Sequence, residues 1–325
     1  MATISNLKQL MKDFSTEEQC RAFLIRQRWD SCPKCPYCGS NKWYNIEGGK
    51  RFKCGNSACY KKYSVTVGTV FHASNIPLTT WFPAMYILSA HKKGISSIQL
   101  AKDLGVTQKT AWFMMHRIRE SLKDKGSDLL KGTIEVDETY LAKKFRSDFK
   151  GLPEEEITKK MKESHNNKGL MFGMVQRKGK IVVKAYDKLS GEEAKKQIKK
   201  HVEKGSTIYS DQSSLYRTGL EDYTRETVIH SRPFLEFVRG DVHVNTLESF
   251  WGMMKRGVYG IYHHISYKHL QAYCDEFTYR RNSRQLKDGD RFELALCNLD
   301  GRLTYNRLVY GQDSKPAKEE GSQTS

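Results

Sequence analysis

Strand-like alternation of apolar and polar positions marks the second half of the chain. In "TIEVD", residues 133–137, two apolar residues face one side of a predicted strand and three polar residues face the other: Thr133, Glu135 and Asp137. Two further strands are predicted in "GLMFGMVQR" and "KIVVKAYDK", followed by a helix over about 191–202. The stretch "GSTIYSD" then predicts a fourth strand, which ends in Asp211.

This order of elements is typical of a ribonuclease-H-like α/β core, with three strands in a meander, a helix and then a fourth strand. In that topology the ends of the first and fourth strands lie side by side. Asp137 and Asp211 are therefore expected to converge, and two like charges at short range need a cation between them. Taken alone, Asp137 followed by Glu138 has a simpler interpretation as a solvated strand end.

A predicted helix that begins near Asn245 offers a third carboxylate, Glu248, with Thr246 as a possible N-terminal cap. Lys255 lies two turns further along the same face. An acid in the first turn of a helix is favourable to the helix dipole without any chemistry. Beside two converging aspartates, however, Glu248 completes a predicted site for two Mg²⁺ ions, for which Mn²⁺ can substitute, in an in-line phosphoryl transfer. Lys255 and Arg256 would then steady phosphate charge.

Helical periodicity runs through residues 77–122. A short helix is predicted to end near Leu104, with Gly105 in the turn, and Thr107 is expected to cap a second, basic helix. This pattern predicts a helix-turn-helix, although helix pairs of the same shape also build ordinary protein cores. If the second helix meets DNA, the candidate contacts are Gln108, Lys109, Trp112 and Arg117.

Five of the eight cysteines lie between residues 32 and 59. The spacing Cys35-x2-Cys38 and Cys54-x4-Cys59 is typical of a zinc ribbon, in which two turns supply four thiolates to a structural Zn²⁺. Cys32 has the same spacing from Cys35 and is an alternative ligand. Two short strands joined at 47–49 are predicted between the cysteine pairs, and "KYSVTVGTVF", residues 62–71, is expected to add a third strand.

The charge balance points to a polyanionic partner. Among 325 residues, 55 are Lys or Arg and 37 are Asp or Glu, which gives a formal net charge of +18 and favours DNA as the partner. No apolar run is long enough to span a membrane, and the first residues lack the apolar core of a signal peptide. We therefore expect a cytoplasmic, nucleoid-associated protein with no membrane partner. The Lys-rich segment 142–168 is predicted to be mobile or to face DNA.

Several of these stretches together are similar to a known family. The chain resembles the zinc-ribbon insertion-sequence transposases of the DDE superfamily, whose core is related to Merlin elements. The resemblance covers about 300 residues and rests on "CPYCGS", "YSVTVGTVF", "SIQLAKDLGVTQKTAW", "IEVDETY", "YSDQSSLY" and "HVNTLESFWGMMKRGVYGIYHHISYKHLQAYCDEFTYRRNSR". It implies DNA transposition, Asp137 and Asp211 as Mg²⁺ ligands, and Lys255 as the trailing basic residue. Related groups have Glu or Asn as the third residue, so Glu248 and Asn245 are both candidates, and Glu248 is favoured because a carboxylate binds Mg²⁺ better than an amide does.

The predicted organisation is multi-domain α+β. It comprises a helical leader (1–31), a zinc ribbon (32–75), a helix-turn-helix region (76–125), a ribonuclease-H-like core (130–305) and a disordered tail (306–325). The resemblance implies an enzyme that binds element ends, cuts DNA and joins it, as a homodimer or higher oligomer on DNA. Two alternatives are a transposase-derived regulator without catalysis and a Mg²⁺-dependent nuclease of the same fold.

Overall fold

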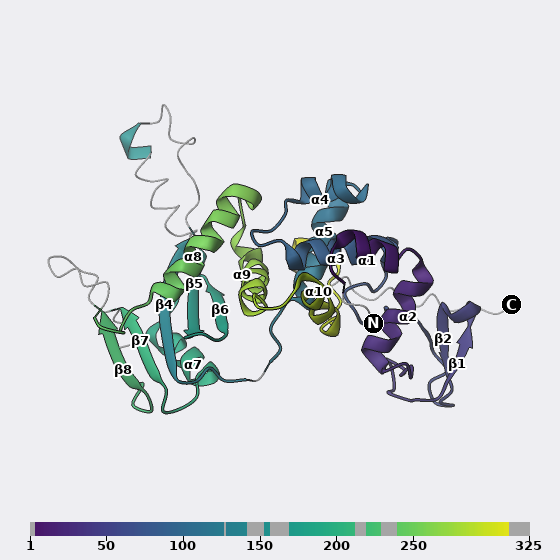
Figure 1. The fold of residues 1–325 in the computed structure, drawn as a ribbon, viewed down its shortest axis with the longest axis horizontal. Helices are drawn as coiled ribbons and strands as arrows, with labels where there is room; N and C mark the ends of the chain where they lie inside the picture. Colours follow the sequence, from purple (N-terminus) through teal and green to yellow (C-terminus); the bar gives the residue numbers. More distant parts are fainter. Residues whose placement is uncertain are drawn as a thin grey trace. The chain divides into compact units, whose positions relative to one another are not determined.

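The computed structural model describes residues 4–126, 128–141, 153–156, 169–211, 219–228 and 239–311. The chain is mixed α+β and divides into two compact units (Figure 1). Unit 1 combines Met1–Tyr86, Ser97–Ser121 and Phe292–Ser325, whereas unit 2 combines Ile87–Ser96 and Leu122–Arg291. Apart from residues 153–156, the predicted segment 142–168 lies outside the described residues. No helix in the described ranges is long and apolar enough to cross a membrane.

Unit 1 begins with two helices, α1 (Leu7–Asp13) and α2 (Glu17–Trp29). The Thr16 side chain accepts a hydrogen bond from the Gln19 amide, and the Gln19 side chain accepts one from the Thr16 amide. This capping box fixes the start of α2 because it satisfies two backbone donors that the helix leaves unpaired.

The ribbon that follows is a three-stranded antiparallel sheet of β1 (Trp43–Ile46), β2 (Arg51–Cys54) and β3 (Lys62–Tyr63). A single turn of 3-10 helix, η1 (Glu47–Gly49), joins β1 to β2, in agreement with the predicted hairpin. The predicted third strand over 62–71 is wrong in length. Only its first two residues pair with β2, and beyond them the backbone folds into turns, with an isolated bridge from Thr69 to Asp300.

The helical part of unit 1 is built on the first residues of α3 (Leu78–Ala90), up to Tyr86, and on α4 (Ser97–Leu104) and α5 (Gln108–Ser121). As predicted, α4 ends at Leu104, and the Thr107 hydroxyl accepts a hydrogen bond from the Thr110 amide at the start of α5. Gly105 adopts a positive φ of 64° in the turn between them, a conformation that costs glycine little.

The chain after residue 291 returns to unit 1. Phe292, in α10 (Asp288–Cys297), packs 5.5 Å from Phe82 and 6.3 Å from Phe14, measured between ring centroids. The predicted core over 130–305 therefore extends too far, because this aromatic cluster recruits the C-terminal residues. The predicted tail also begins too early: α11 (Tyr305–Tyr310) is an ordered helix, and residues 312–325 lie outside the described part.

Unit 2 contains a five-stranded sheet in the order β6-β5-β4-β7-β8. Strand β4 (Thr133–Leu141) pairs antiparallel with β5 (Gly169–Gln176), and β5 pairs antiparallel with β6 (Ile181–Tyr186). On its other side β4 runs parallel to β7 (Thr207–Asp211), which runs parallel to β8 (Thr224–Val228). The edge strand β8 was not predicted from the sequence.

Helices cover both faces of this sheet. The helix α7 (Gly191–His201) places Ala194 and Ile198 against Ile134 and Val136 of β4. On the other face lie α8 (Asn245–Gly257), the π-helical turn η3 (Val258–Tyr262) and α9 (Tyr267–Asn282) (Figure 1). Ile134 and Val136 thus point to α7, whereas Glu135, Asp137 and Thr139 on the alternate positions point to α8.

Candidate functional site

The polar face of β4 contacts α8 at three successive positions. The Trp251 indole nitrogen Nε1 donates to Asp137 Oδ2 over 2.9 Å, and Lys255 Nζ donates to Thr139 Oγ1 over 2.7 Å. The third contact joins Glu135 to the first turn of α8. Two residues of a strand advance by about 6.7 Å and four residues of a helix by about 6 Å. This match lets α8 run alongside β4 and hold one side chain opposite each polar residue.

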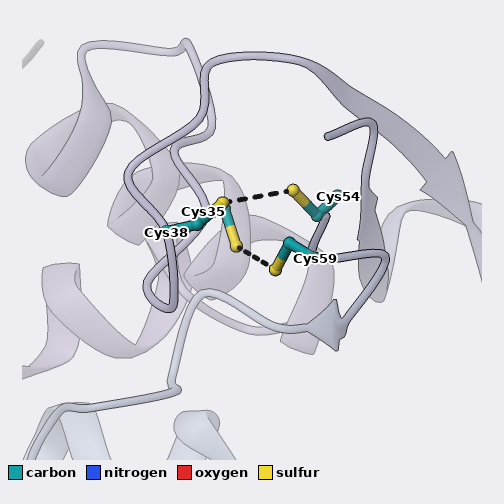
Figure 2. A group of neighbouring side chains, drawn as sticks. All are labelled: Cys35, Cys38, Cys54 and Cys59. Atoms are coloured by element: carbon teal, nitrogen blue, oxygen red, sulfur yellow. Dashed lines mark hydrogen bonds between the residues drawn. The ribbon is translucent and has the colours of Figure 1, made fainter. Parts of the chain in front are cut away.

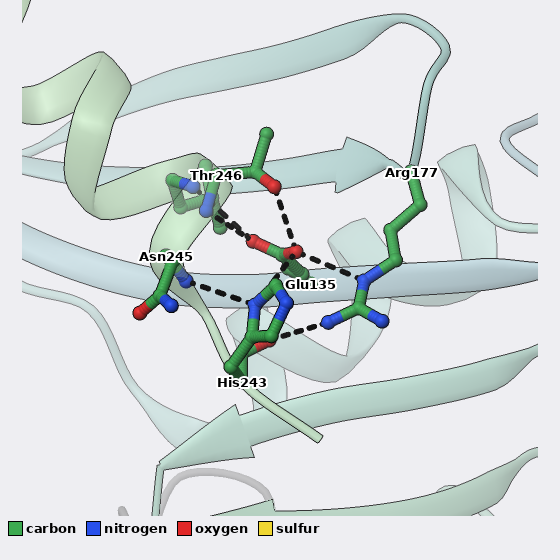
Figure 3. A network of polar contacts seen from close by, with 6 residues as sticks. Glu135, Arg177, His243, Asn245 and Thr246 are labelled. Carbon is green, nitrogen blue, oxygen red and sulfur yellow. Dashed lines mark hydrogen bonds and ion pairs between the residues drawn. The ribbon is translucent and has the colours of Figure 1, made fainter. Parts of the chain in front are cut away.

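Glu135 anchors the N-terminus of α8 (Figure 3). Its side chain is fully buried, at 0% exposure, and its carboxylate accepts hydrogen bonds from the Thr246 amide (2.9 Å), the Thr246 hydroxyl (2.8 Å) and the Leu247 amide (3.2 Å). Thr246 was expected to cap the helix, but it lies inside the first turn. Val244 stands at the cap position and offers no side-chain acceptor, so the carboxylate from β4 supplies the acceptor and complements the helix dipole.

One cationic partner, Arg177, compensates the buried charge of Glu135. Arg177 Nε donates to Glu135 Oε1 over 3.1 Å, and Arg177 Nη2 donates to the His243 carbonyl over 3.2 Å (Figure 3). His243 Nδ1 lies 3.5 Å from the same carboxylate oxygen, and the Arg177 guanidinium stacks 4.8 Å from the centroid of the Tyr209 ring. Such pairing is what allows a carboxylate to stay buried. The alternation of the strand predicts Glu135 on the polar face, but no local pattern indicates this network.

Gly173 makes room for Trp251. It lies opposite Asp137 in the β4–β5 pairing, and a Cβ added there would come within 2.7 Å of the Trp251 ring and 2.9 Å of a Leu247 methyl group. A side chain at Gly173 would therefore collide with the indole that donates to Asp137.

Asp137 and Asp211 lie on neighbouring parallel strands. The pairing of β4 with β7 reaches Glu135 opposite Tyr209, and each aspartate lies two residues further along its own strand. Burial raises the pKa of Asp137 to about 7, and the charges of Glu138 and Asp211 raise it as well, while the Trp251 hydrogen bond opposes them. The carboxylates therefore repel one another in the absence of a cation.

The sequence predicts that the first strand ends at Asp137, and this is wrong. Strand β4 continues to Leu141 through its pairing with β5. Asp137 is instead the second residue beyond the last pair with β7. Glu248 and Asn245 are both exposed in the first turn of α8. Within the described ranges, Asp137, Asp211 and Glu248 do not form a group of potential metal ligands of the kind that the cysteines form.

The four predicted cysteines form the second candidate site (Figure 2). Their sulfur atoms lie within 4.8 Å of one another, with 3.8 Å between the Sγ atoms of Cys35 and Cys59 and 3.5 Å between those of Cys38 and Cys54. A tetrahedral zinc ion with bonds of about 2.3 Å requires sulfur–sulfur distances of about 3.8 Å. The thiol donor set and its spacing therefore fit Zn²⁺, and Cys32 stays outside the group.

Two family models match the chain. Residues 129–282 match the ISXO2-like transposase domain, and residues 15–62 match the transposase zinc-ribbon domain. The chain belongs to the zinc-ribbon transposases of insertion sequences. The transposase-domain match includes β4, β7 and α8 with their carboxylates. The zinc-ribbon match includes the four cysteines, which supports a structural Zn²⁺ in this chain.

One relative is a protein of Halobacterium salinarum described as an uncharacterized protein in transposable element ISH50. It is 27% identical to this chain over 288 residues, which cover 83% of this chain and 92% of the relative. No solved structure matches the chain.

The residues predicted to meet DNA differ in accessibility. Gln108 and Lys109 are exposed on α5, and Trp112 is half-buried against His116. Arg117 was expected at the DNA surface, but the structure corrects this: only 3% of it is exposed, and Nη2 donates to the His72 carbonyl. Arg256 is exposed on α8. The long alkyl stem of arginine fits an apolar interior, which explains why a basic residue in a predicted recognition helix became part of the core.

Proposed function

We propose that the protein is a DNA transposase that binds element ends and catalyses Mg²⁺-dependent DNA cleavage and strand transfer. The observation that carries the proposal is the placement of Asp137 and Asp211 on adjacent parallel strands, inside the region that matches a transposase domain. The sheet order supports a ribonuclease-H-like core, because the first three strands form an antiparallel meander and the fourth, after a helix, joins the first in parallel.

Asp137, Asp211 and Glu248 are the proposed ligands of two Mg²⁺ ions. Carboxylate oxygens are the donors that Mg²⁺ prefers. Burial, together with the charges of Glu138 and Asp211, raises the pKa of Asp137, and a bound cation would favour its ionised form. Mg²⁺ bound there would activate water or a 3′-hydroxyl and stabilise the leaving oxygen. The part of Trp251 is to orient Asp137 through its hydrogen bond, and the part of Glu135 is to hold α8 in register with β4.

Helix geometry favours Glu248 over Asn245 as the third residue. Lys255 contacts Thr139 of β4 and so marks the side of α8 that faces the polar edge of the strand. At about 100° per residue, Glu248 lies about 20° around the helix from Lys255, whereas Asn245 lies about 80° away. We therefore assign the third ligand to Glu248 and a phosphate-steadying role to Lys255, whose ammonium group is already held beside the site.

DNA recognition is proposed for the zinc ribbon and for a helix-turn-helix made by α4 and α5. The short turn at Gly105, the capped start of α5 and the exposure of Gln108 and Lys109 support this assignment. Because two element ends must be brought together, we further propose that the protein acts as a homodimer or a higher oligomer on DNA.

The test is cleavage of a labelled duplex that carries an element end. Asp137→Ala and Asp211→Ala are expected to abolish Mg²⁺-dependent cleavage and to leave end binding unchanged, because the proposed binding elements lie in unit 1. Asp187→Ala, outside the site, serves as a control of equal charge change. Wild-type cleavage by either aspartate variant would overturn the assignment. Tight end binding without cleavage by the wild type would favour a regulator, and cleavage without joining would favour a nuclease.

A further inference from the structure

A pocket on the far flank of α8 is lined by cationic side chains. It has a volume of about 580 Å³, and six of its ten lining residues are basic: Lys92, Arg256, Arg280, Arg281, Arg284 and Arg291. The described residues that line it include no Asp or Glu. Ser249 adds a hydroxyl group, whereas the Thr246 hydroxyl donates to Glu135. Phe250 and Met253 form an apolar wall.

Two of the arginines build the pocket walls. Arg291 Nε donates to the Ser283 carbonyl over 3.0 Å and Nη2 to the Arg284 carbonyl over 3.2 Å, so that it ties the end of α9 to the start of α10. Arg280 pairs with the buried Glu276 and donates to the Leu88 carbonyl over 3.0 Å. These hydrogen bonds hold the walls of the pocket in place within unit 2.

Part of the positive charge of the pocket lacks an acidic partner among the described residues. Arg280 is only 4% exposed, yet its Nε and Nη1 have no hydrogen-bond partner in the described part of the chain. Lys92, Arg256 and Arg281 form no ion pair with any described carboxylate. Burial and the nearby Arg284 lower the pKa of Arg281, although Glu135 opposes them. Neighbouring positive charges without acidic partners favour a bound anion.

We propose that this pocket binds the sugar-phosphate backbone of a DNA strand. Guanidinium and hydroxyl groups are the usual donors to phosphate oxygens, while the Phe250–Met253 wall suits the apolar face of a sugar. The volume exceeds that of a single phosphate group, which favours a stretch of backbone over a free anion.

The position of the pocket complements the proposed carboxylate site. Five of the lining residues belong to α8: Thr246, Ser249, Phe250, Met253 and Arg256. Of these, Ser249, Met253 and Arg256 lie on the flank of the helix opposite Trp251 and Lys255, which face β4. A strand held in the pocket would lie about one helix diameter, roughly 10 Å, from the carboxylates. The inference rests on the proposed function for its choice of DNA.

The test measures affinity for a short duplex of random sequence by fluorescence anisotropy as salt is varied, with the full chain and without divalent cations. Lys92→Gln together with Arg281→Gln removes two charges from the pocket. Lys196→Gln together with Lys200→Gln removes two exposed charges from α7 and serves as the matched control. We expect the pocket variant to bind about tenfold more weakly. The slope of log affinity against log salt concentration should become shallower by about 1 to 2, because each phosphate that the protein no longer neutralises contributes about 0.9. The control variant should show less than half of these changes.

Equal changes in both double variants, or no change in either, would overturn the proposal. A second measurement, the thermal stability of the wild type in inorganic phosphate, separates the sources of the anion: strong stabilisation by phosphate, with unchanged DNA affinity in the pocket variant, would assign the pocket to a free anion instead. Because no cleavage is measured, the result stands even if the wild type proves unable to cut DNA.

Discussion

Trp251 donates its indole hydrogen bond to Asp137, and the carboxylate that receives it has a pKa raised to about 7. The indole reaches Asp137 across the space that Gly173 leaves open in β5. A helix side chain thus fixes the orientation of a strand carboxylate before any metal is bound. This hydrogen bond, with those of Glu135 and Lys255, joins α8 to β4 at three successive positions of the proposed active site.

Replacing Trp251 by Phe is expected to shift the pH dependence of cleavage. Without the indole donor the pKa of Asp137 rises further, so that a higher pH is needed before the carboxylate can bind Mg²⁺. The acid limb of the cleavage profile should move to higher pH, and the free energy of unfolding should fall by about 1 kcal/mol. Trp43→Phe in the ribbon is the control. Superimposable pH profiles of wild type and Trp251→Phe would contradict this role.

Glu135→Gln is expected to destabilise unit 2 by about 3 kcal/mol, because it leaves Arg177 without its buried partner and weakens the cap of α8. Chemical denaturation, with Glu226→Gln as a control for an exposed ion pair, measures the difference. The loss of stability should be accompanied by slower cleavage, since α8 carries Glu248. If Glu135→Gln were no more destabilising than Glu226→Gln, the anchoring role of Glu135 would be refuted.

Asp137→Asn is expected to stabilise the metal-free protein at pH 8. The pKa of Asp137 is about 7 in the folded state and about 3.9 in an unfolded chain. The folded state therefore binds more protons between these values, and wild-type stability falls as the pH rises from about 4 to 7. A non-titrating amide escapes this loss, which is at most about 4 kcal/mol.

Thermal unfolding in a chelator, at pH 4.5 and pH 8, measures that gain. The variant should exceed the wild type in midpoint temperature at pH 8 and lose most of the advantage at pH 4.5. An advantage of equal size at both pH values would show that ionisation of Asp137 is not its source.

Removal of zinc is expected to unfold the ribbon, because four thiolates hold together strands too short to form a core of their own. The purified protein should contain one zinc per chain, and Cys38→Ser should lose it together with ordered ribbon structure. Cys32 lies outside the ligand group, so Cys32→Ser should keep both. Full zinc content in Cys38→Ser, or loss of zinc in Cys32→Ser, would require a different ligand set.

Sequence patterns are sufficient to predict elements whose structure depends on residues that are near one another in the chain. The hairpin of the ribbon, the caps around Gly105 and the strand that contains Asp137 follow from turn residues, cysteine spacing and alternation. By contrast, β8 has the sequence "TRETV", with little apolar alternation, because an edge strand is exposed on one side. Its existence depends on its partner β7 and not on its own pattern.

Other features depend on tertiary contacts that the local sequence pattern does not reveal. Glu135 and Arg117 are charged residues that the fold buries, one to cap α8 and the other to bind the His72 carbonyl. No local pattern distinguishes them from solvated charges. Unit 2 likewise ends at Arg291, before the predicted end of the core, because Phe292 packs against aromatic rings of unit 1 that are far away in the sequence.

The most direct test of the account is movement of a marked mini-element in cells. It compares the wild type with Asp211→Ala, Glu248→Ala and Asn245→Ala, at matched protein levels. The account predicts movement with the wild type and with Asn245→Ala, and loss of movement in Asp211→Ala and Glu248→Ala. Movement that persists without the carboxylates of Asp211 and Glu248 would contradict the proposed metal site and its mechanism.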